Sequence, residues 1–523
     1  MIDIPTDHGG AACSDLPDHS TIIACSGRHC CQSSITRIVY TRVRIVVVCK
    51  PRIQFFASGC LANQHMTPLP ASITQAITGW GNHPVQSCRL YRPETRHDAA
   101  ALLGAGGSGT YIGRGLGRSY GDAALNDDQN VVLMTRLDRM IDFDAETGVL
   151  TCEAGVSLQK IIELFLPRGF CPLVVPGTQF VTVGGAIAAD VHGKNHHQDG
   201  SFGTSLIAFE LLSPTGQILH CNRETNSDVF CATLGGMGMT GLVLTAQFRL
   251  HRVESAYLAI DQVKATDIEE ILDIFEREDQ RYRYSVAWID CLARKTSLGR
   301  GVLIRGDHAL AADLPRDLRD RPLSIPTRRS ISVPFQTPAW LLNRQIVRSF
   351  NAAYYRLCSE GRRLVDFHSF FFPLDRVRHW NWLYGCRGFM QYQCVLSEAS
   401  GRAGLLCILN HLGRSIPGSY LAVLKRLGPK GEGLLSFPMS GPTLCLDFPN
   451  LGQRLINLVR ELDAIVLEHG GRVYLAKDAC LQAKMLAPMY PRLEEFQRIQ
   501  GHLDPEQQFS SSLARRIGLL EYR

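Results

Sequence analysis

Three glycine-rich segments lie between residues 111 and 197, and they constrain the fold more than any other feature of the chain. They are YIGRGLGRSYGD at 111–122, GTQFVTVGG at 177–185 and HGKNHH at 192–197. Glycine adopts positive φ without steric cost and lets the backbone approach a ligand closely. Consecutive backbone N–H groups in such turns form anion-binding nests. One such loop would be weak evidence, but three together indicate a cradle for a large anionic cofactor.

The elements around these loops narrow the choice of cofactor. Residues 85–253 alternate short strands with turn signals, and they predict strands at 131–134 and 148–153, a helix at 157–166 and a hairpin of 206–213 with 217–221. We find no βαβ repeat and no early GxGxxG of the Rossmann type. The expected cofactor is therefore FAD, bound by another fold.

The second half of the chain has a different pattern. It predicts a helix at 268–278, a strand at 284–290, three strands of one sheet at 391–396, 420–424 and 442–448, and an amphipathic helix at 455–468. Residues 310–343 are rich in Pro, Arg and Asp, which favours either a functional lid or disorder. We expect regular structure to resume at 367–373. The predicted fold class is α+β.

Length and charge exclude some functions. A chain of 523 residues is long enough for two or three domains. The formal charge of +6 is mild, and no dense basic run with interleaved aromatics is present, so nucleic acid binding is not expected. The 18 cysteines are mostly single and lack metal-site spacing, which favours reduced thiols and no bound metal.

Residues 1–65 are unlike the remainder. They show no sustained helical period, and their best apolar run, 45–49, is too short to span a bilayer. No signal peptide is indicated. We predict that translation starts at Met66 and that 1–65 are a non-native leader; the alternative is a genuine, poorly ordered leader. The expected location is cytoplasmic or peripheral to the plasma membrane.

Several motifs in a fixed order carry a family resemblance. They are GWG at 79–81, RGLGRSYGD at 114–122, VTVGGA at 181–186, HGKNHH at 192–197, GFMQYQ at 388–393, YLAKD at 474–478 and ARR at 514–516. These segments resemble the vanillyl-alcohol-oxidase-type (PCMH-type) FAD-binding superfamily, and within it the decaprenylphosphoryl-β-D-ribose 2-oxidase family. The resemblance runs from about residue 79 to the C-terminus.

The resemblance implies a domain plan. A two-subdomain PCMH-type FAD-binding domain would occupy 66–254. A substrate domain at 255–471, built on an antiparallel sheet with flanking helices, would include a mobile segment at 310–343. Residues 472–523 would return to the FAD domain.

The resemblance also implies noncovalent FAD. Some relatives attach flavin through a histidine in the first loop, where this chain has Ser119-Tyr120. The implied cofactor-binding residues are Arg114, Gly115, Leu116, Gly117, Arg118, Ser119, Tyr120, Gly121, Gly177, Thr182, Val183, Gly184, Gly185, Ala189, His192, Val243 and Tyr474.

Catalytic and substrate residues follow by the same resemblance. Lys477, Tyr120 and His192 would be catalytic, with Lys477 or Tyr120 taking the hydroxyl proton. A salt bridge from Lys477 to Asp478 is the plainer alternative. The implied substrate-binding residues are Lys194, Gln393, Lys425 and Cys445.

Other roles for these residues stay open, and two positions depart from the family. Cys445 could be a buried small apolar residue, and His196 and His197 could be structural. Thr443 replaces a family asparagine, and Leu427 stands where an aromatic residue is common. Both departures bear on sugar specificity.

The expected activity is FAD-dependent oxidation of a secondary sugar hydroxyl. By resemblance the substrate is a polyprenylphosphoryl ribose, oxidised at C2, with a separate short-chain reductase completing epimerisation to arabinose. A membrane surface would supply the lipid-linked substrate. The alternatives are a soluble sugar, alditol or aldonolactone oxidase, and a flavin-binding partner subunit without turnover.

Overall fold

The computed structural model describes residues 71–104, 108–326, 330–338, 342–414 and 419–520. All of them belong to one unit, Met66–Arg523. The predicted leader at 1–65 and the Met66 start lie outside the described residues. In these ranges no helix has both the length and the apolar composition needed to cross a membrane.

The first sheet has four strands in the order β1-β2-β4-β3. β1 and β2 form an antiparallel pair, whereas β2 and β3 both run parallel to β4. The sequence did not predict this parallel pairing, because each strand is only four to seven residues long. The elements are β1 (Ser72–Thr78), β2 (Val85–Tyr91), α1 (Arg96–Gly104), β3 (Tyr111–Arg114), β4 (Asn130–Leu133) and η1 (Met134–Arg136).

The second sheet is antiparallel and runs in the order β5-β6-β10-β8-β9, with β7 also paired to β10. It contains the predicted strand at 148–153 and the predicted hairpin, which are both confirmed. Its strands are β5 (Met140–Asp144), β6 (Val149–Glu153), β7 (Phe170–Pro172), β8 (Leu206–Leu212), β9 (Ile218–Asn222) and β10 (Leu242–Arg252). The helices beside it are α2 (Leu158–Phe165), η2 (Leu166–Arg168), α3 (Val183–Ala188), α4 (His196–Asp199), α5 (Phe202–Ser205) and α6 (Ser227–Thr233).

Helix α2 shows how local sequence sets this region. Its buried side chains, Leu158, Ile161, Ile162 and Phe165, recur at helical spacing. The Ser157 hydroxyl caps its N-terminus by accepting from Lys160 N. The chain leaves the helix at Pro167 and Gly169, which has φ 81°. The predicted helix at 157–166 is confirmed.

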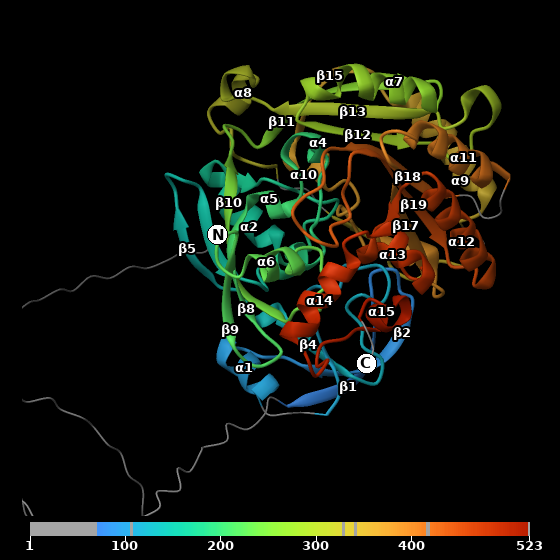
Figure 1. The fold of residues 1–523 in the computed structure, drawn as a ribbon. Coiled ribbons are helices and arrows are strands. Elements are labelled where there is room, and N and C mark those ends of the chain that lie inside the picture. The colour runs from blue at the N-terminus through green and yellow to red at the C-terminus, as the bar shows by residue number, and fades with distance from the viewer. Residues whose placement is uncertain (1–70, 105–107, 327–329, 339–341, 415–418, 521–523) are drawn as a thin grey trace, which may run out of the picture. The chain divides into compact units, whose positions relative to one another are not determined.

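The third sheet is antiparallel and has eight strands, in the order β15-β11-β13-β12-β18-β19-β17-β20. The three strands predicted to share a sheet are its neighbours β18, β19 and β17. Figure 1 shows helices α11 and α12 beside these three strands, and α7 beside β13 and β15. The strands are β11 (Tyr257–Ala265), β12 (Tyr284–Ile289), β13 (Gly301–His308), β15 (Gly361–Asp366), β17 (Phe389–Val395), β18 (Leu421–Leu427), β19 (Gly441–Pro449) and β20 (Arg472–Val473).

Helices surround this sheet. Those at 268–278 and 455–468 were predicted, and α11 was not. The elements are α7 (Ile268–Glu278), η3 (Asp279–Arg281), η4 (Lys295–Ser297), α9 (Arg344–Leu357), α10 (Phe367–Phe371), η6 (Trp380–Tyr384), α11 (Gly401–Arg414) and α12 (Gln453–Glu468).

Regular structure resumes earlier than the sequence analysis expected. Helix α9 begins at Arg344, after an Asn343 cap that accepts from two backbone N–H groups, and buries only Val347 and Asn351. Its apolar residues do recur at helical spacing, but Ile346, Phe350 and Leu357 are 45%, 62% and 83% exposed. The described parts of 310–343 contain η5 (Ala311–Asp313), α8 (Arg316–Arg319) and β14 (Ile331–Ser332), which pairs with β16 (Val377–Arg378). The mobility of this segment stays a prediction.

The C-terminal segment contacts the first sheet. Phe509 forms a parallel bridge with Tyr111, and the Arg516 guanidinium binds both Asp122 and Asp478. Figure 1 shows red α15 near blue β2. The elements are η7 (Leu475–Lys477), η8 (Ala483–Met485), α13 (Leu486–Met489), α14 (Leu493–Leu503) and α15 (Ser512–Ile517).

Candidate active site

The first glycine loop, 113–123, begins at the end of β3, and the side chain of one of its own residues stabilises it. The Arg114 guanidinium donates to Thr78 O at 2.7 Å and to Ala124 O at 3.1 Å, so this side chain closes the loop. Gly117 has φ +64°, the left-handed region that favours glycine. A Cβ on Gly121 would lie 1.9 Å from Asp478 O, so the loop packs directly on the C-terminal segment.

The second glycine turn caps helix α3. Thr182 Oγ1 accepts from Gly185 N at 3.2 Å, while Val183 N and Gly184 N donate to Val156 O and Ala154 O. A Cβ on Gly115 would lie 2.2 Å from Thr182 Oγ1. The two glycine turns, 67 residues apart in sequence at those two positions, are therefore in contact.

The third sheet presents a polar face made by alternate residues of three strands. Register pairs Gln391 with Asp447 and Gln393 with Cys445 across β17 and β19, and Lys425 of β18 with Thr443 of β19. Side chains two residues apart on a strand point to the same side. The Gln393 amide donates to Thr443 Oγ1 at 3.0 Å and lies 2.9 Å from His192 Nε2. This contact joins the glycine-rich region to the sheet.

His192 is buried and neutral. Its Nε2 accepts from the Gln393 amide, which leaves the proton on Nδ1, and Nδ1 is buried without a partner among the described residues. Burial, followed by the charge of Lys425, holds the histidine pKa well below its ordinary value. Its ring lies 5.2 Å from that of Tyr474 and 5.4 Å from that of Phe437. The Nδ1–H of this imidazole can therefore donate a hydrogen bond to a bound ligand.

Lys477 faces the same polar region. Its Nζ donates to Cys445 Sγ at 3.3 Å and lies 5.6 Å from the centre of the Tyr120 ring. Asp478 instead binds Arg516 at 2.8 Å, so the simple salt bridge between Lys477 and Asp478 does not form. In the part of the chain that the structure describes, no carboxylate oxygen lies within 4.0 Å of Lys477 Nζ.

Two further lysines lie nearby and are partly buried. Lys425 Nζ donates to Gly193 O at 3.4 Å, and burial together with Lys477 lowers its pKa to about 8. Lys194 Nζ donates to Phe370 O and lies 4.2 Å from the centre of the Phe370 ring. Burial and then Lys425 lower the pKa of Lys194 to about 7. Three partly buried lysine side chains in one region favour an anionic occupant.

The other predicted residues lie around this region. The Tyr120 ring packs edge-on against Phe389 at 5.5 Å, and burial raises its pKa well above the ordinary value. The Tyr474 hydroxyl donates to Ala189 O at 2.9 Å. Val243 lies at a bulge of β10, and Gly177 is exposed with open space around its Cα. His196 and His197 bind backbone groups of neighbouring segments, as a structural role predicts.

Comparison with known proteins decides the family. A model of the FAD binding domain matches residues 90–222, and a model of D-arabinono-1,4-lactone oxidase matches residues 453–517. Decaprenylphosphoryl-beta-D-ribose oxidase of Mycolicibacterium smegmatis is 37% identical over 454 residues, which cover 86% of this chain and 98% of that protein. The chain belongs to the decaprenylphosphoryl-β-D-ribose oxidase family.

Two other relatives place the family in context. An uncharacterized protein of Streptomyces coelicolor is 36% identical over 70% of this chain and 100% of its own length. The L-gulonolactone oxidase of Scyliorhinus torazame is 26% identical over 32% of this chain and 38% of its own length. This family member is therefore an FAD-dependent oxidoreductase of the PCMH-type superfamily that acts on CH–OH groups.

The residues present fit FAD. Within the described ranges, no acceptor lies at hydrogen-bond distance from the backbone N–H groups of Leu116, Gly117, Arg118 and Ser119, so a diphosphate would satisfy them. The unpartnered Nδ1 of His192 is a further donor. The side chain of Arg114 is not available, because it closes the loop.

Sequence reasoning missed three features of this site. Gln391 and Asp447 lie two residues from Gln393 and Cys445 on the same strands, and period-two alternation would have placed them on the polar face. The guanidinium of Arg118 lies over the rings of Trp80 at 4.0 Å and Phe180 at 4.7 Å. No sequence signal links those three residues, which come from three separate segments.

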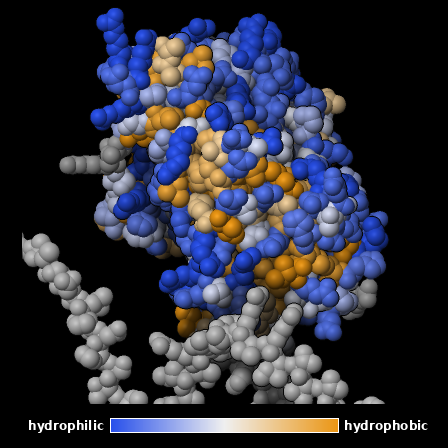
Figure 2. All heavy atoms as spheres, turned by 90° about the vertical axis from the view of Figure 1, so that its left-hand side faces the viewer, coloured by the Kyte–Doolittle hydropathy of each residue, from blue (hydrophilic) through white to orange (hydrophobic). Residues whose placement is uncertain are grey.

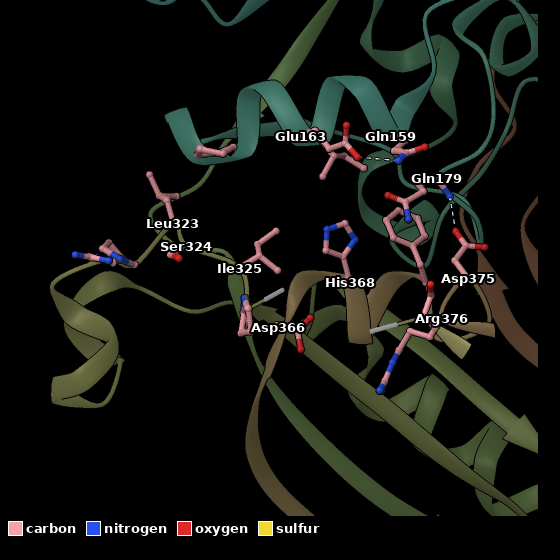
Figure 3. Close-up of a pocket in the computed structure, with 17 residues that line it drawn as sticks. Gln159, Glu163, Gln179, Leu323, Ser324, Ile325, Asp366, His368, Asp375 and Arg376 are labelled. Atoms are coloured by element: carbon pink, nitrogen blue, oxygen red, sulfur yellow. Dashed lines mark hydrogen bonds between the residues drawn. The ribbon is translucent and has the colours of Figure 1, made fainter. Parts of the chain in front are cut away.

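A cavity of ≈ 820 Å³ lies elsewhere, between α2, α10, residues 321–326 and Ser330. Figure 3 shows Glu163, Gln179, His368 and Asp375 around it, with hydrogen bonds from Gln159 to Glu163 and from Gln179 to Asp375. None of the predicted catalytic or substrate residues lines this cavity. His368 and Phe372 border it, whereas Phe370 of the same short segment contacts Lys194.

Proposed function

We propose that this oxidoreductase oxidises the C2 hydroxyl of a polyprenylphosphoryl ribose to the keto form, as the first half of epimerisation to arabinose. The observation that carries the proposal is the continuous contact from His192 through Gln393 to the strand that bears Cys445, with Lys477 bonded to that cysteine. The relative from M. smegmatis, whose name refers to a lipid-linked ribose, supports this substrate class.

The residues have distinct roles in this proposal. The bound flavin would accept hydride from the sugar carbon. Lys477 or Tyr120 would take the hydroxyl proton, and the absence of a carboxylate partner among the described residues leaves the Lys477 ammonium free to orient the hydroxyl. His192 would donate from Nδ1 to flavin or substrate oxygen.

Lys425 and Lys194 would bind the substrate phosphate. Both are partly buried, and neither forms an ion pair with a carboxylate within the described ranges. Gln393 and Cys445 would line the sugar pocket. Thr443, which donates to Cys394 O at 2.8 Å and accepts from Gln393, would set the position of that amide in place of the family asparagine.

The cofactor would be noncovalent, since Ser119 and Tyr120 stand where a covalent histidine would be expected. The domain plan of 66–254, 255–471 and 472–523 belongs to this proposal. Its support is that the first two sheets draw their strands from 72–252, whereas the third draws all its strands but β20 from 257–449. Denaturation in acid that releases all the FAD into the supernatant would test the mode of attachment.

The proposal also includes two partners, a short-chain reductase and an anionic membrane surface. Apolar side chains between residues 331 and 357 are 62–83% exposed, namely Ile331, Phe335, Phe350 and Leu357. Figure 2 shows a further band of apolar side chains on the face where β5 lies. Flotation with anionic and with neutral vesicles would test the membrane contact.

One alternative has specific support. The match of residues 453–517 to D-arabinono-1,4-lactone oxidase, and the relatives that are L-gulonolactone oxidases, favour a soluble aldonolactone or alditol oxidase as the second candidate. A flavin-binding partner subunit without turnover is the third.

Anaerobic bleaching of the flavin in the full-length holoenzyme separates these candidates. A polyprenylphosphoryl ribose is added in one arm, and free ribose, alditols and aldonolactones in the others. Bleaching by the lipid-linked sugar alone is the expected result. Bleaching by free polyols or lactones would instead assign the soluble oxidase, and no bleaching by any of them would assign the partner subunit.

A further inference from the structure

Asp447 is a buried carboxyl at the centre of the site to which the proposed function gives no role. It lies on β19, is 1% exposed, and pairs in register with Gln391 of β17 and Leu421 of β18. Its Oδ1 accepts from Gln391 Nε2 at 2.5 Å, whereas Oδ2 is buried and has no partner in the described part of the chain. Burying a carboxyl oxygen without a partner opposes folding, which points to a use in chemistry.

The titratable groups that face Asp447 come from several elements. They are Tyr120 of the first glycine loop, Tyr384 of η6, Lys477 of η7, and Cys445 of its own strand. After burial, the charge of Asp447 is the largest influence that raises the pKa of both tyrosines. Burial raises the pKa of Asp447 itself to about 6, against the hydrogen bond of Gln391 and the charge of Lys477.

Tyr120 lies beside the pair formed by Gln391 and Asp447. Its ring packs edge-on against that of Phe389 at 5.5 Å, and Phe389 lies two residues before Gln391 on the same side of β17. Gln391 donates to Asp447 Oδ1, and its influence on Tyr120 opposes the effect of burial on the tyrosine pKa. Because the Tyr120 ring is also 5.6 Å from Lys477 Nζ, the tyrosine lies near both the lysine and the carboxyl.

We propose that Asp447 is the positioning residue that receives, by way of Tyr120, the proton released by the substrate hydroxyl. The C–H bond breaks and its electron pair leaves as hydride to the oxidised flavin. The O–H proton passes to Tyr120 Oη as the tyrosine proton passes to Asp447 Oδ2, and the C=O bond forms. This inference rests on the proposed function only in requiring that a hydroxyl is oxidised.

The chain supplies a matched control. Asp463 of α12 is also a buried carboxyl, its pKa is raised to about 7, and its Oδ1 accepts from Tyr392 OH at 3.0 Å. Tyr392 lies between Gln391 and Gln393 on β17, so it points to the opposite side of the sheet. Asp463→Asn should therefore change a buried carboxyl without touching the site.

The test uses the FAD-loaded full-length chain and its Asp447→Asn, Asp447→Glu and Asp463→Asn variants. The rate of flavin reduction is measured by stopped flow from pH 5 to 9 with whichever sugar bleaches the wild-type flavin. Since Asp447 accepts a proton only when ionised, the wild-type rate should fall below a pH near 6. Asp447→Asn should slow reduction by about 100-fold and remove this pH limb. Asp447→Glu should restore part of the rate and the limb, and Asp463→Asn should match the wild type.

An infrared titration gives a readout that needs no substrate. The carboxyl C=O stretching band of the oxidised holoenzyme should titrate near pH 6, and Asp447→Asn should remove that component while Asp463→Asn leaves it. If Asp447→Asn slowed flavin reduction but its rate still fell below pH 6, Asp447 would have only a structural role and the inference would be overturned. If the wild-type rate did not fall below pH 6, the inference would also be overturned, even if Asp447→Asn did not fold. Reduction by a free polyol alone would refute the lipid-linked substrate but leave the Asp447 test intact, whereas no reduction by any sugar would overturn both.

Discussion

The two sides of the third sheet at β17 each hold a buried carboxyl, but their surroundings differ. On one side Gln391 donates to Asp447, and on the other Tyr392 donates to Asp463. Burial raises the pKa of both carboxyls, to about 6 and about 7 respectively. The pKa shift alone therefore does not tell a functional carboxyl from a structural one.

The neighbours make the distinction. The Asp447 side faces Tyr120, His192, Lys425 and Lys477, which come from segments that meet only in the folded chain. The Asp463 side is covered by α11 and α12, whose buried residues are almost all apolar. Strand β17 thus lines the candidate active site with one face and packs into the hydrophobic core with the other.

The largest effect should come from the lysine on the site side. Lys477→Ala removes the group that bonds Cys445 and faces Tyr120, so flavin reduction should slow by roughly 10³-fold. Stopped-flow reduction measures the loss. Lys484→Ala, which alters an exposed lysine seven residues along, is the control and should keep the wild-type rate. Equal rates for all three proteins would contradict the role of Lys477.

Substitutions at two adjacent residues of β17 should have different effects, one on the rate of flavin reduction and the other on the free energy of unfolding. Gln393→Leu removes the donor to His192 and Thr443, and should slow flavin reduction by about 30-fold because two buried partners are left unpaired. Tyr392→Phe removes the donor to Asp463, and should lower the free energy of unfolding by about 1–2 kcal/mol at unchanged rate. Stopped-flow rates and urea unfolding of both variants check the pair. A slow Tyr392→Phe enzyme would mean that the two faces are coupled.

The carboxyl on the helix side should affect stability in a pH-dependent way. Because the folded pKa of Asp463 is raised from 3.8 to about 7, the folded state binds its proton more tightly than the unfolded state does. Stability should therefore fall as pH rises from about 4 to 7, by at most roughly 4 kcal/mol from this group. Asp463→Asn should lack that slope and exceed the wild type above pH 7 in urea unfolding. Parallel curves for the two proteins would show that the carboxyl is not perturbed.

The smallest expected effect is a pH-dependent change in the KM for the substrate, caused by Lys425 on the active-site face of the third sheet. Lys425 loses its charge as pH rises through about 8, so the KM for a phosphorylated substrate should increase above that pH. Lys425→Arg keeps its charge and should hold KM within about two-fold from pH 7 to 9. Steady-state KM measured with phosphorylated and unphosphorylated sugars checks this, since the unphosphorylated sugar should show no such rise.

Several elements were predictable because their sequence pattern is local. Helix α2 carries a cap, an apolar stripe and a Pro-Gly ending, and the hairpin of β8 and β9 follows from its turn residues. Helix α9 was missed although its apolar residues recur at helical spacing. The parallel pairs of the first sheet were missed because short strands do not encode their partners. Arg114 was predicted as a cofactor residue, but its guanidinium closes its own loop.

The sequence by itself determined the glycine loops, the α+β class, the family and the FAD requirement, because those depend on residue types at fixed local spacing. Only the tertiary structure decided that His192 meets Gln393, 201 residues away, and that Lys477 binds Cys445 and not Asp478. It also decided which of two buried carboxyls faces the site. The register of β17, β18 and β19 and the packing of the C-terminal segment against the first glycine loop determine which side chains far apart in sequence become partners. No local sequence pattern predicts that register or that packing.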